Sequence, residues 1–225
     1  ASTIVDIGAG TGSYAFFLAE YGYEVIAVEP SATMRNQAIS HPAIEWVDGY
    51  AENLPLSDGA AEAAIIMLAF HHFQDYRQAL REVHRVVGSG QIILFTYDPA
   101  MISSFWLTKY FPSLIKDVES RFISIPELSN EIHLITGNSV NVSPFRLPHN
   151  LSDSFAAVGW ARPELYLDIN IRNGISSFAK IDGDEVEQGV LRLKEDLETG
   201  RWDKEYGYLR KQKQYDVGYR FVVSK

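Results

Sequence analysis

Three glycines at alternate positions, Gly8, Gly10 and Gly12, directly follow a short apolar run over residues 4–7 that contains one acid, Asp6. Glycines at this spacing remove the side chains that would keep a ligand away from the backbone, and they permit a tight turn. The helix predicted to follow points its first N–H groups at whatever lies in that turn. The pattern therefore predicts a binding site for a nucleotide-like ligand.

A second acid stands at the end of the next predicted strand. Residues 23–29 are mostly apolar and end at Glu29, about 20 residues beyond the glycine turn, where nucleotide folds bind a ribose 2′-OH. A carboxylate accepts hydrogen bonds from both vicinal hydroxyls. We therefore predict that Glu29 binds a ribose. The alternatives are a glycine turn that only joins strand to helix, and a surface acid.

The acid placed two residues before G-x-G-x-G resembles the first motif of class I S-adenosylmethionine-dependent methyltransferases, D/E-x-G-x-G-x-G. The dinucleotide fingerprint G-x-G-x-x-G/A instead has glycine or alanine at the position where this chain has Ser13. S-adenosylmethionine carries no pyrophosphate, so the resemblance implies a turn that accommodates an amino acid tail and a sulfonium. It also implies that Asp6 helps with that positive charge, directly or through water. An NAD(P)-dependent oxidoreductase and a non-catalytic cofactor-binding domain are the alternative functions.

A segment after the third predicted strand is similar to G-D-A-E-x-L-P-F of the ubiquinone/menaquinone-biosynthesis-like methyltransferases. Tyr50 departs from that pattern, because an acid that meets the adenine amino group is common there. The adenine contact stays open between the Ala51 backbone, the Glu52 side chain and Tyr50. The matching residues are Gly49, Ala51, Glu52, Leu54 and Pro55.

The resemblance implies S-adenosyl-L-methionine as the cofactor. A residue at the position of Met34 packs on the adenine or ribose in that family, and a core methionine is the alternative. The predicted cofactor-binding residues are Asp6, Gly8, Ala9, Gly10, Gly12, Glu29, Pro30, Met34, Ala51, Glu52 and Leu68.

Methyl transfer mainly needs alignment and exclusion of water, and it needs a base only if the acceptor must lose a proton. The fourth predicted strand, residues 63–70, is followed by His71 and His72. Adjacent residues of an extended chain point in opposite directions, so we predict that only His71 faces the pocket, as a weak base or an orienting group. A histidine held by packing is the alternative. The predicted acceptor-binding residues are Tyr97, Trp106, His149 and Arg172.

Apolar runs alternate with helical patterns, which is typical of a doubly wound α/β protein with a mostly parallel sheet. The resemblance implies a Rossmann-like methyltransferase fold with seven strands, an antiparallel last strand and a helical insertion. An aromatic, helix-like segment over 101–122 is predicted either to lie over the acceptor as a lid or to dock on the core. We divide the chain into a cofactor-binding half (1–99), a lid segment with a helix and the sixth strand (100–148), a helical insertion or acceptor cap (149–215), and the final strand (216–225).

The composition favours a small-molecule acceptor. A net charge of −9 argues against a nucleic-acid or anionic-membrane partner. Residues 68–71, Leu-Ala-Phe-His, lack the Asn/Asp-Pro-Pro-aromatic motif common in enzymes that methylate nucleobase or glutamine nitrogens. No cysteines, no visible signal peptide and no apolar run of about 20 residues are present, so we expect a cytoplasmic enzyme. No metal site is expected. The chain opens almost directly on its first strand, which leaves open a preceding segment, and the oligomeric state is also open.

Overall fold

The structure is a computed structural model that describes residues 2–151 and 155–225. The chain divides into two compact units. Unit 1 comprises Ala1–Tyr97, Ile123–Ser143 and Arg220–Lys225, and unit 2 comprises Asp98–Phe122 and Pro144–Tyr219. The aromatic segment after the fifth strand thus belongs with the insertion, whereas the next helix and most of the sixth strand belong with the sheet. The division predicted from the sequence differs, because it places the aromatic segment, the next helix and the sixth strand together in residues 100–148.

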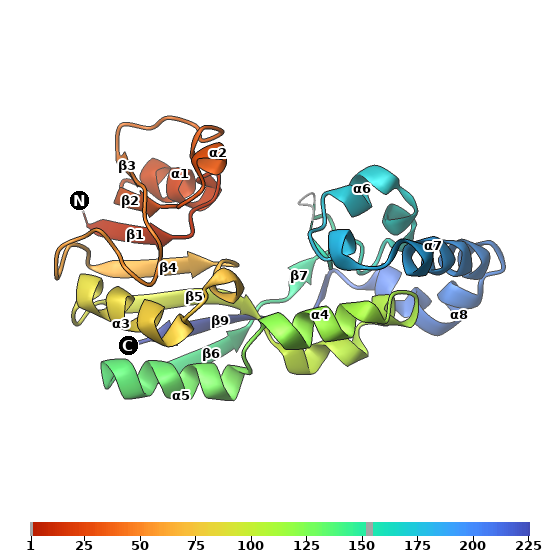
Figure 1. Cartoon of the computed structure of the whole chain (residues 1–225). Coiled ribbons are helices and arrows are strands. Elements are labelled where there is room, and N and C mark those ends of the chain that lie inside the picture. Colours follow the sequence, from red (N-terminus) through yellow and green to blue (C-terminus); the bar gives the residue numbers. More distant parts are fainter. Residues whose placement is uncertain (1, 152–154) are drawn as a thin grey trace. The chain divides into compact units, whose positions relative to one another are not determined.

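Unit 1 is built on a seven-stranded sheet with the order β3-β2-β1-β4-β5-β9-β6 (Figure 1). The first five strands pair in parallel, and β9 runs against them. This confirms the predicted mostly parallel sheet with an antiparallel last strand. The strands are β1 (Thr3–Ile7), β2 (Glu24–Val28), β3 (Ile44–Val47), β4 (Ala63–Met67), β5 (Gln91–Tyr97), β6 (Val140–Pro144) and β9 (Tyr219–Ser224).

Both faces of this sheet are covered, and strand β2 shows how. Val25 and Ala27 pack in a small cluster with Ala15 and Ala19 of helix α1 (Ser13–Glu20). The intervening residues Ile26 and Val28 belong to the larger core, which also holds residues of α3 and α5. Because successive side chains of a strand point to opposite faces, the two clusters lie on opposite faces of the sheet. A parallel strand buried on both faces is apolar along its buried length, as this one is from Val25 to Val28.

The other helical elements of unit 1 are short or begin at a side-chain cap. Asp75 accepts a hydrogen bond from the Gln78 N–H at 3.0 Å at the start of α3, and Ser124 caps α5 in the same way. Strand β4 is shorter than predicted, since Leu68 leaves the extended conformation and residues 70–72 form a 3-10 turn. The elements are α2 (Ala32–Arg35), η1 (Phe70–His72), α3 (Tyr76–Val87) and α5 (Ile125–Thr136).

Unit 2 is mostly helical and has an aromatic core. The Trp106 indole N–H donates to the Trp160 carbonyl at 2.9 Å, and its ring meets Trp202 and Tyr166 edge-on. The predicted helix over 101–122 is three shorter helices, because Phe105 is extended and Pro112 precedes the third. The elements are η2 (Pro99–Ser104), η3 (Trp106–Lys109), α4 (Ser113–Arg121), β7 (Leu147–Pro148), η4 (Pro163–Leu167), α6 (Ile169–Asn173), η5 (Phe178–Lys180), α7 (Gly183–Glu198), α8 (Arg201–Tyr206), η6 (Gly207–Lys211) and β8 (Gln214–Tyr215).

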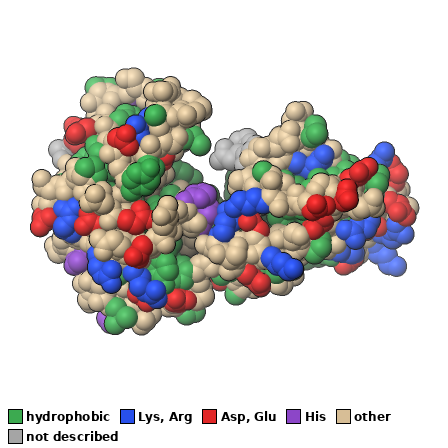
Figure 2. Space-filling view, viewed as in Figure 1, with side chains coloured by type: hydrophobic (Ala, Val, Ile, Leu, Met, Phe, Trp, Pro, Cys, Tyr) green, Lys and Arg blue, Asp and Glu red, His purple; other side chains and the backbone are tan. Residues whose placement is uncertain are grey.

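Acidic and basic side chains are interspersed on the face of each unit drawn in Figure 2, with no large area of one sign. Among the described residues, no helix combines the length and the apolar character that crossing a bilayer requires.

One arginine of α3 fixes the loop between β3 and β4. The Arg85 guanidinium donates to the carbonyls of Leu54 and Leu56 at 3.0 and 2.7 Å. It also pairs with Asp58 at 2.8 Å and with Glu82 at 2.7 Å, and Glu82 in turn accepts from the Leu54 N–H at 2.9 Å. These partners raise the pKa of Arg85 above its ordinary value. Both the N–H and the carbonyl groups of the loop backbone are therefore hydrogen-bonded to side chains of helix α3.

We expect Arg85→Met to lower the free energy of unfolding by about 1–3 kcal/mol, because two loop carbonyls and two carboxylates lose their donor. Arg81→Met is the matched control, since Arg81 lies one turn away on the same helix, is exposed, and has no hydrogen bond or ion pair recorded among the described residues. Urea denaturation of both variants measures the difference. Equal losses in the two variants would show that Arg85 does not fix the loop.

Candidate functional site

The glycine turn after β1 is held in place by backbone hydrogen bonds. The N–H groups of Gly8 and Ala9 both donate to the Val28 carbonyl, at 2.8 and 3.1 Å, and the Gly12 N–H donates to the Ala9 carbonyl at 2.8 Å. Gly10 has φ +59° and Gly12 has φ +82°, in the left-handed region that favours glycine. A methyl group on Gly12 would lie 2.6 Å from the Trp46 ring, whereas one on Gly10 would meet nothing within 4 Å. Space in front of the backbone is therefore left open at Gly10 and filled at Gly12.

Glu29 connects this turn to the end of β2. One carboxylate oxygen accepts from the Gly10 N–H at 2.9 Å, and the other accepts from the Ser31 N–H at 2.9 Å. The residue is 9% exposed. Each oxygen of an ionised carboxylate has two lone-pair positions, so both retain one for a further donor. Glu29 thus shapes the turn and still offers two acceptor positions.

Asp6 lies behind the turn and is 1% exposed. Burial raises the pKa of Asp6 from its ordinary 3.8 to about 7, the Ala15 N–H opposes that shift, and the charge of Glu29 adds to it. Its Oδ2 is buried and has no hydrogen-bond partner among the described residues. A buried oxygen of this kind is costly to leave unpaired. A cation placed near the turn would stabilise the ionised form.

A cavity of about 400 Å³ opens at the carboxyl ends of the parallel strands. Its walls come from the segments that follow β1, β2, β3 and β4, which is where ligands bind in open α/β sheets. Its volume lies in the range typical of small-molecule sites. The predicted residues that line it are Gly8, Gly10, Glu29, Pro30, Met34, Ala51, Glu52 and Leu68. Asp6, Ala9 and Gly12 are outside this lining, and the Gly12 N–H closes the turn on the Ala9 carbonyl.

The sequence predictions did not assign five lining residues to the cofactor site, namely Ser31, Ala69, His72, Phe73 and Gln74. Gly49 and Tyr50 also line the cavity; Gly49 belongs to the matched motif, and Tyr50 is one of the three candidates for the adenine contact. Leu68 has φ +54°, a conformation that an L-residue without a short polar side chain rarely adopts. Its N–H donates to the Phe95 carbonyl at 2.8 Å, which holds the bend. Strained backbone of this kind is concentrated at functional sites. Leu68 is among the predicted cofactor-binding residues, but nothing in the sequence signals this backbone conformation, because leucine is ordinary at a strand end.

The histidine assignment changes with this bend. The prediction that His71 faces the pocket assumed an extended chain, but both histidines follow Leu68 in or next to a 3-10 turn, with their rings 4.0 Å apart. His72 lines the cavity and His71 does not. The chemistry predicted for His71 therefore moves to His72 as a proposal.

Glu52 has a structural task besides its place in the cavity wall. Its Oε1 accepts from the N–H groups of Gln74 and Asp75, at 2.7 and 3.3 Å. These two residues directly precede α3, so Glu52 joins the β3–β4 loop to the start of that helix. The sequence motif placed Glu52 at the site but did not reveal this role.

The four predicted acceptor residues do not form one cluster within a unit. Tyr97 ends β5 in unit 1 and is 6% exposed, and Trp106 is 4% exposed in the aromatic core of unit 2. Burial of a large ring whose N–H already has an acceptor explains the position of Trp106. His149 meets the Trp160 ring edge-on at 5.7 Å. Arg172 lines a separate cavity within unit 2.

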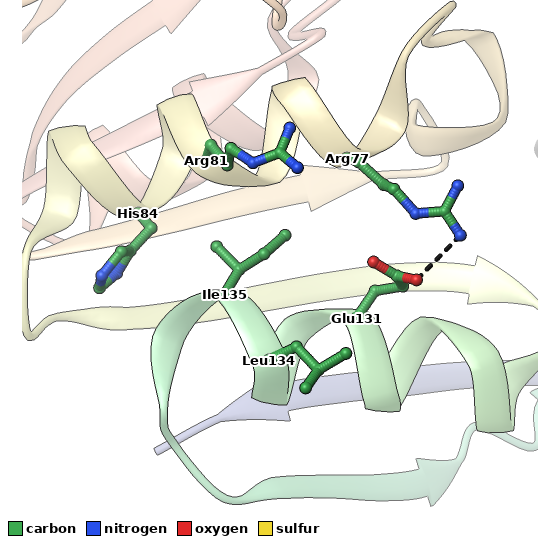
Figure 3. Close-up of a pocket in the computed structure, with 6 residues that line it drawn as sticks. All are labelled: Arg77, Arg81, His84, Glu131, Leu134 and Ile135. Atoms are coloured by element: carbon green, nitrogen blue, oxygen red, sulfur yellow. Dashed lines mark hydrogen bonds and ion pairs between the residues drawn. The ribbon is translucent and has the colours of Figure 1, made fainter.

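A further hollow in unit 1 lies between α3 and α5 (Figure 3). Arg77, Arg81 and His84 come from α3, and Glu131 faces them from α5, with Arg77 and Glu131 paired at 2.8 Å. Glu127 adds a second acid 3.6 Å from Arg77. This hollow is formed by two helices and not by strand ends. Among the described residues, no group of three histidine, aspartate or glutamate side chains is arranged to hold a metal ion.

Comparison with known proteins identifies the family. A methyltransferase-domain family matches residues 5–95. The crystal structure of a putative methyltransferase from an antibiotic biosynthesis pathway of Anabaena variabilis is 45% identical, has a TM-score of 0.94, and is matched over 100% of this chain and 91% of that chain. The chain belongs to the class I S-adenosylmethionine-dependent methyltransferases. This confirms the predicted resemblance, and S-adenosylmethionine is the cofactor. Nothing in the comparisons supports an oxidoreductase.

Curated relatives match between about two fifths and two thirds or more of the chain. The ubiquinone/menaquinone biosynthesis C-methyltransferase UbiE of Rubrivivax gelatinosus is 38% identical over 89 residues, which are 39% of this chain and 36% of that protein. The demethylmenaquinone methyltransferase of Thermus thermophilus is 28% identical over 175 residues, 70% of this chain and 74% of that protein. The chain thus spans little more than a third of the first of these relatives.

Substitution of Gly10 and of Gly12 is expected to have different effects on stability and on cofactor binding, because their surroundings differ. Gly10→Ala and Gly12→Ala both place alanine in the left-handed region, at a cost of about 1–2 kcal/mol. We expect Gly12→Ala to be the less stable variant, because its methyl group collides with Trp46. Gly10→Ala is expected to weaken S-adenosylmethionine binding more than its loss of stability explains, because its methyl group enters the cavity. Urea denaturation and titration calorimetry measure the two effects, and variants that are equal in both would contradict this division.

The raised pKa of Asp6 predicts that the stability of the folded chain depends on pH. Below about pH 4 the carboxyl is protonated in the folded and unfolded states, and between about pH 4 and 7 only the unfolded chain loses the proton. The free energy of unfolding therefore falls as the pH rises through this window. We expect Asp6→Asn to gain stability relative to the wild type between pH 4.5 and 8, by about 4 kcal/mol at most. Urea denaturation at both pH values tests this, and a difference independent of pH would contradict the raised pKa.

Proposed function

We propose that the chain transfers a methyl group from S-adenosylmethionine to a small-molecule acceptor, and that the cavity at the strand ends holds the cofactor. The observation that carries this proposal is the combination at the turn. Gly10 leaves its backbone open to the cavity, and Glu29 offers two free acceptor positions beside it. These features suit a ligand with vicinal hydroxyls that approaches the backbone closely.

The charges and walls of the cavity also fit this cofactor. The unpartnered Oδ2 of Asp6 lies behind the turn, and its ionised form would be stabilised by a sulfonium or an ammonium group. Met34 and Tyr50 are 44% and 63% exposed although they line the cavity. Exposed apolar side chains in a cavity wall favour a planar base as their partner. Tyr50 and Met34 are therefore proposed to bind the adenine, with Glu29 on the ribose.

S-adenosylmethionine, when bound, supplies a methyl group on a sulfonium whose departure leaves a neutral thioether. The residues of the chain then have to align the acceptor with the methyl group and exclude water, and for some acceptors they have to remove a proton. His72 is proposed for this last task because its ring lines the cavity and an imidazole titrates near neutral pH. An acceptor that carries no proton at the reacting atom would not need His72.

A small molecule is the proposed acceptor class. The net charge of −9 does not suit a polyanionic substrate. The Rubrivivax relative is named for ubiquinone and menaquinone biosynthesis, and the Anabaena structure for an antibiotic biosynthesis pathway. These names belong to those proteins, and they support an acceptor of low molecular weight here.

We expect Glu29→Gln to weaken S-adenosylmethionine binding by about 1–3 kcal/mol, roughly 5- to 150-fold, because an amide replaces one of the two acceptor oxygens. Glu24→Gln is the matched control, since Glu24 is an exposed residue at the opposite end of the same strand. Titration calorimetry gives both affinities, and urea denaturation shows whether either variant is damaged. Unchanged affinity in Glu29→Gln would contradict the ribose assignment.

The activity itself is tested with a metabolite extract and S-adenosylmethionine labelled in its methyl group. Label in a low-molecular-weight product supports the proposal. Label found only in protein or nucleic acid would overturn the acceptor class. Cofactor binding with no transfer to any fraction would favour a cofactor-binding domain without catalysis.

A further inference from the structure

Unit 2 contains a cavity of about 280 Å³ formed by α6, η5 and α7. All of its walls belong to one compact unit, so it exists independently of the cofactor site. Most of its lining is apolar, with one guanidinium and one amide. The lining residues are Ile169, Arg172, Asn173, Phe178, Ala179 and Val186.

Arg172 has a charge that the described residues do not neutralise directly. One of its N–H groups donates to the Tyr166 carbonyl at 2.7 Å, and no ion pair to it is recorded among the described residues. Burial lowers the pKa of Arg172, and Asp168 is the charge that opposes this shift. Asp168 already accepts from the Asn170 N–H at 2.8 Å as the cap of α6. A half-buried cation without an anionic partner is costly, and a bound anion would remove that cost.

Other cavity walls of this protein show the opposite arrangement. Arg77, in the hollow between α3 and α5, faces Glu131 at 2.8 Å (Figure 3). A second cavity of unit 2 is lined by Arg192 and Arg201 together with two acids, and Arg201 pairs with both of them. The guanidinium of Arg172 differs because none of the described residues that line its cavity is an acid.

We propose that this cavity binds a compact organic anion, a carboxylate on a small apolar body. The planar guanidinium retains N–H donors that match the two oxygens of a carboxylate. Phe178, Ile169 and Val186 provide apolar contact for the rest of the ligand. A volume near the lower end of known ligand sites limits that body to about the size of a single ring. The proposal concerns binding alone and does not depend on methyl transfer.

The test uses 4-fluorobenzoate as the probe and the full chain without S-adenosylmethionine, with ¹⁹F NMR as the readout. 4-Fluorobenzamide and 4-fluorobenzylamine have the same ring with a neutral or a cationic head. We expect 4-fluorobenzoate to bind and each of the other two to bind at least tenfold more weakly. Amide binding equal to that of the carboxylate would overturn the proposal.

Variants locate the site. Arg172→Gln is expected to weaken 4-fluorobenzoate binding about tenfold or more, because a charged hydrogen-bond donor is lost. Ala179→Phe fills the cavity from an exposed position and is expected to abolish binding. Arg192→Gln is the matched control, because Arg192 also donates to a tyrosine carbonyl, that of Tyr110 at 2.9 Å, but lies among acids. Unchanged binding in the first two variants, with each shown to be folded by circular dichroism, would overturn the proposal.

Competition with inorganic phosphate separates charge from shape. Weak displacement of 4-fluorobenzoate by phosphate at equal concentration supports a site for a carboxylate with an apolar body. Displacement by phosphate as effective as that by unlabelled benzoate would show that the cavity recognises charge alone, and would overturn the assignment of the ligand class.

Discussion

The hydrogen bonds between the Glu29 carboxylate and two backbone N–H groups are the constraint on which the cavity at the strand ends depends. Gly10 and Ser31 lie on different loops, and each donates to one oxygen of the same carboxylate at 2.9 Å. This side chain, together with the N–H groups of Gly8 and Ala9 that donate to the Val28 carbonyl, holds the glycine turn against the end of β2. A backbone turn with positive φ values has no side chain of its own to hold it. An acid with both oxygens engaged supplies that rigidity, and it still has lone pairs left for a ligand.

The same device recurs at the next two loops. Glu52 accepts from two N–H groups at the start of α3, and Glu82 accepts from the Leu54 N–H while it pairs with Arg85. Arg85 completes the pattern by donating to two carbonyls of the same loop. The segments after the parallel strands pair only part of their polar backbone groups with strand carbonyls, as the N–H groups of Gly8 and Ala9 do with Val28. Charged side chains from α3 and from the loops bind others, and so the chain's own side chains hold the cavity walls.

Local patterns were enough to predict the sheet, the glycine turn and the position of Glu29 beside that turn. Contacts between residues far apart in the sequence explain what these patterns did not reveal. The alternation of apolar runs and the spacing of glycines are properties of adjacent residues, and they are preserved in the fold. The bend at Leu68 depends on a hydrogen bond to Phe95, which is far along the chain, so the exchange of His71 for His72 in the cavity wall was hidden. Trp106 was predicted at the acceptor because aromatic residues suit a lid. Its burial depends on Trp160, Trp202 and Tyr166, whose proximity no local pattern reveals.

Asp6 lowers the stability of the folded chain at neutral pH. A neutral side chain of the same shape would suit its buried position better at neutral pH, because burial and the nearby Glu29 both disfavour the carboxylate. The acid does not line the cavity, so it gains nothing from contact with solvent there. A cation at the turn would favour the ionised form. The positive charge of the cofactor proposed above would supply that partner, which accounts for an aspartate where a neutral asparagine would be more stable at neutral pH.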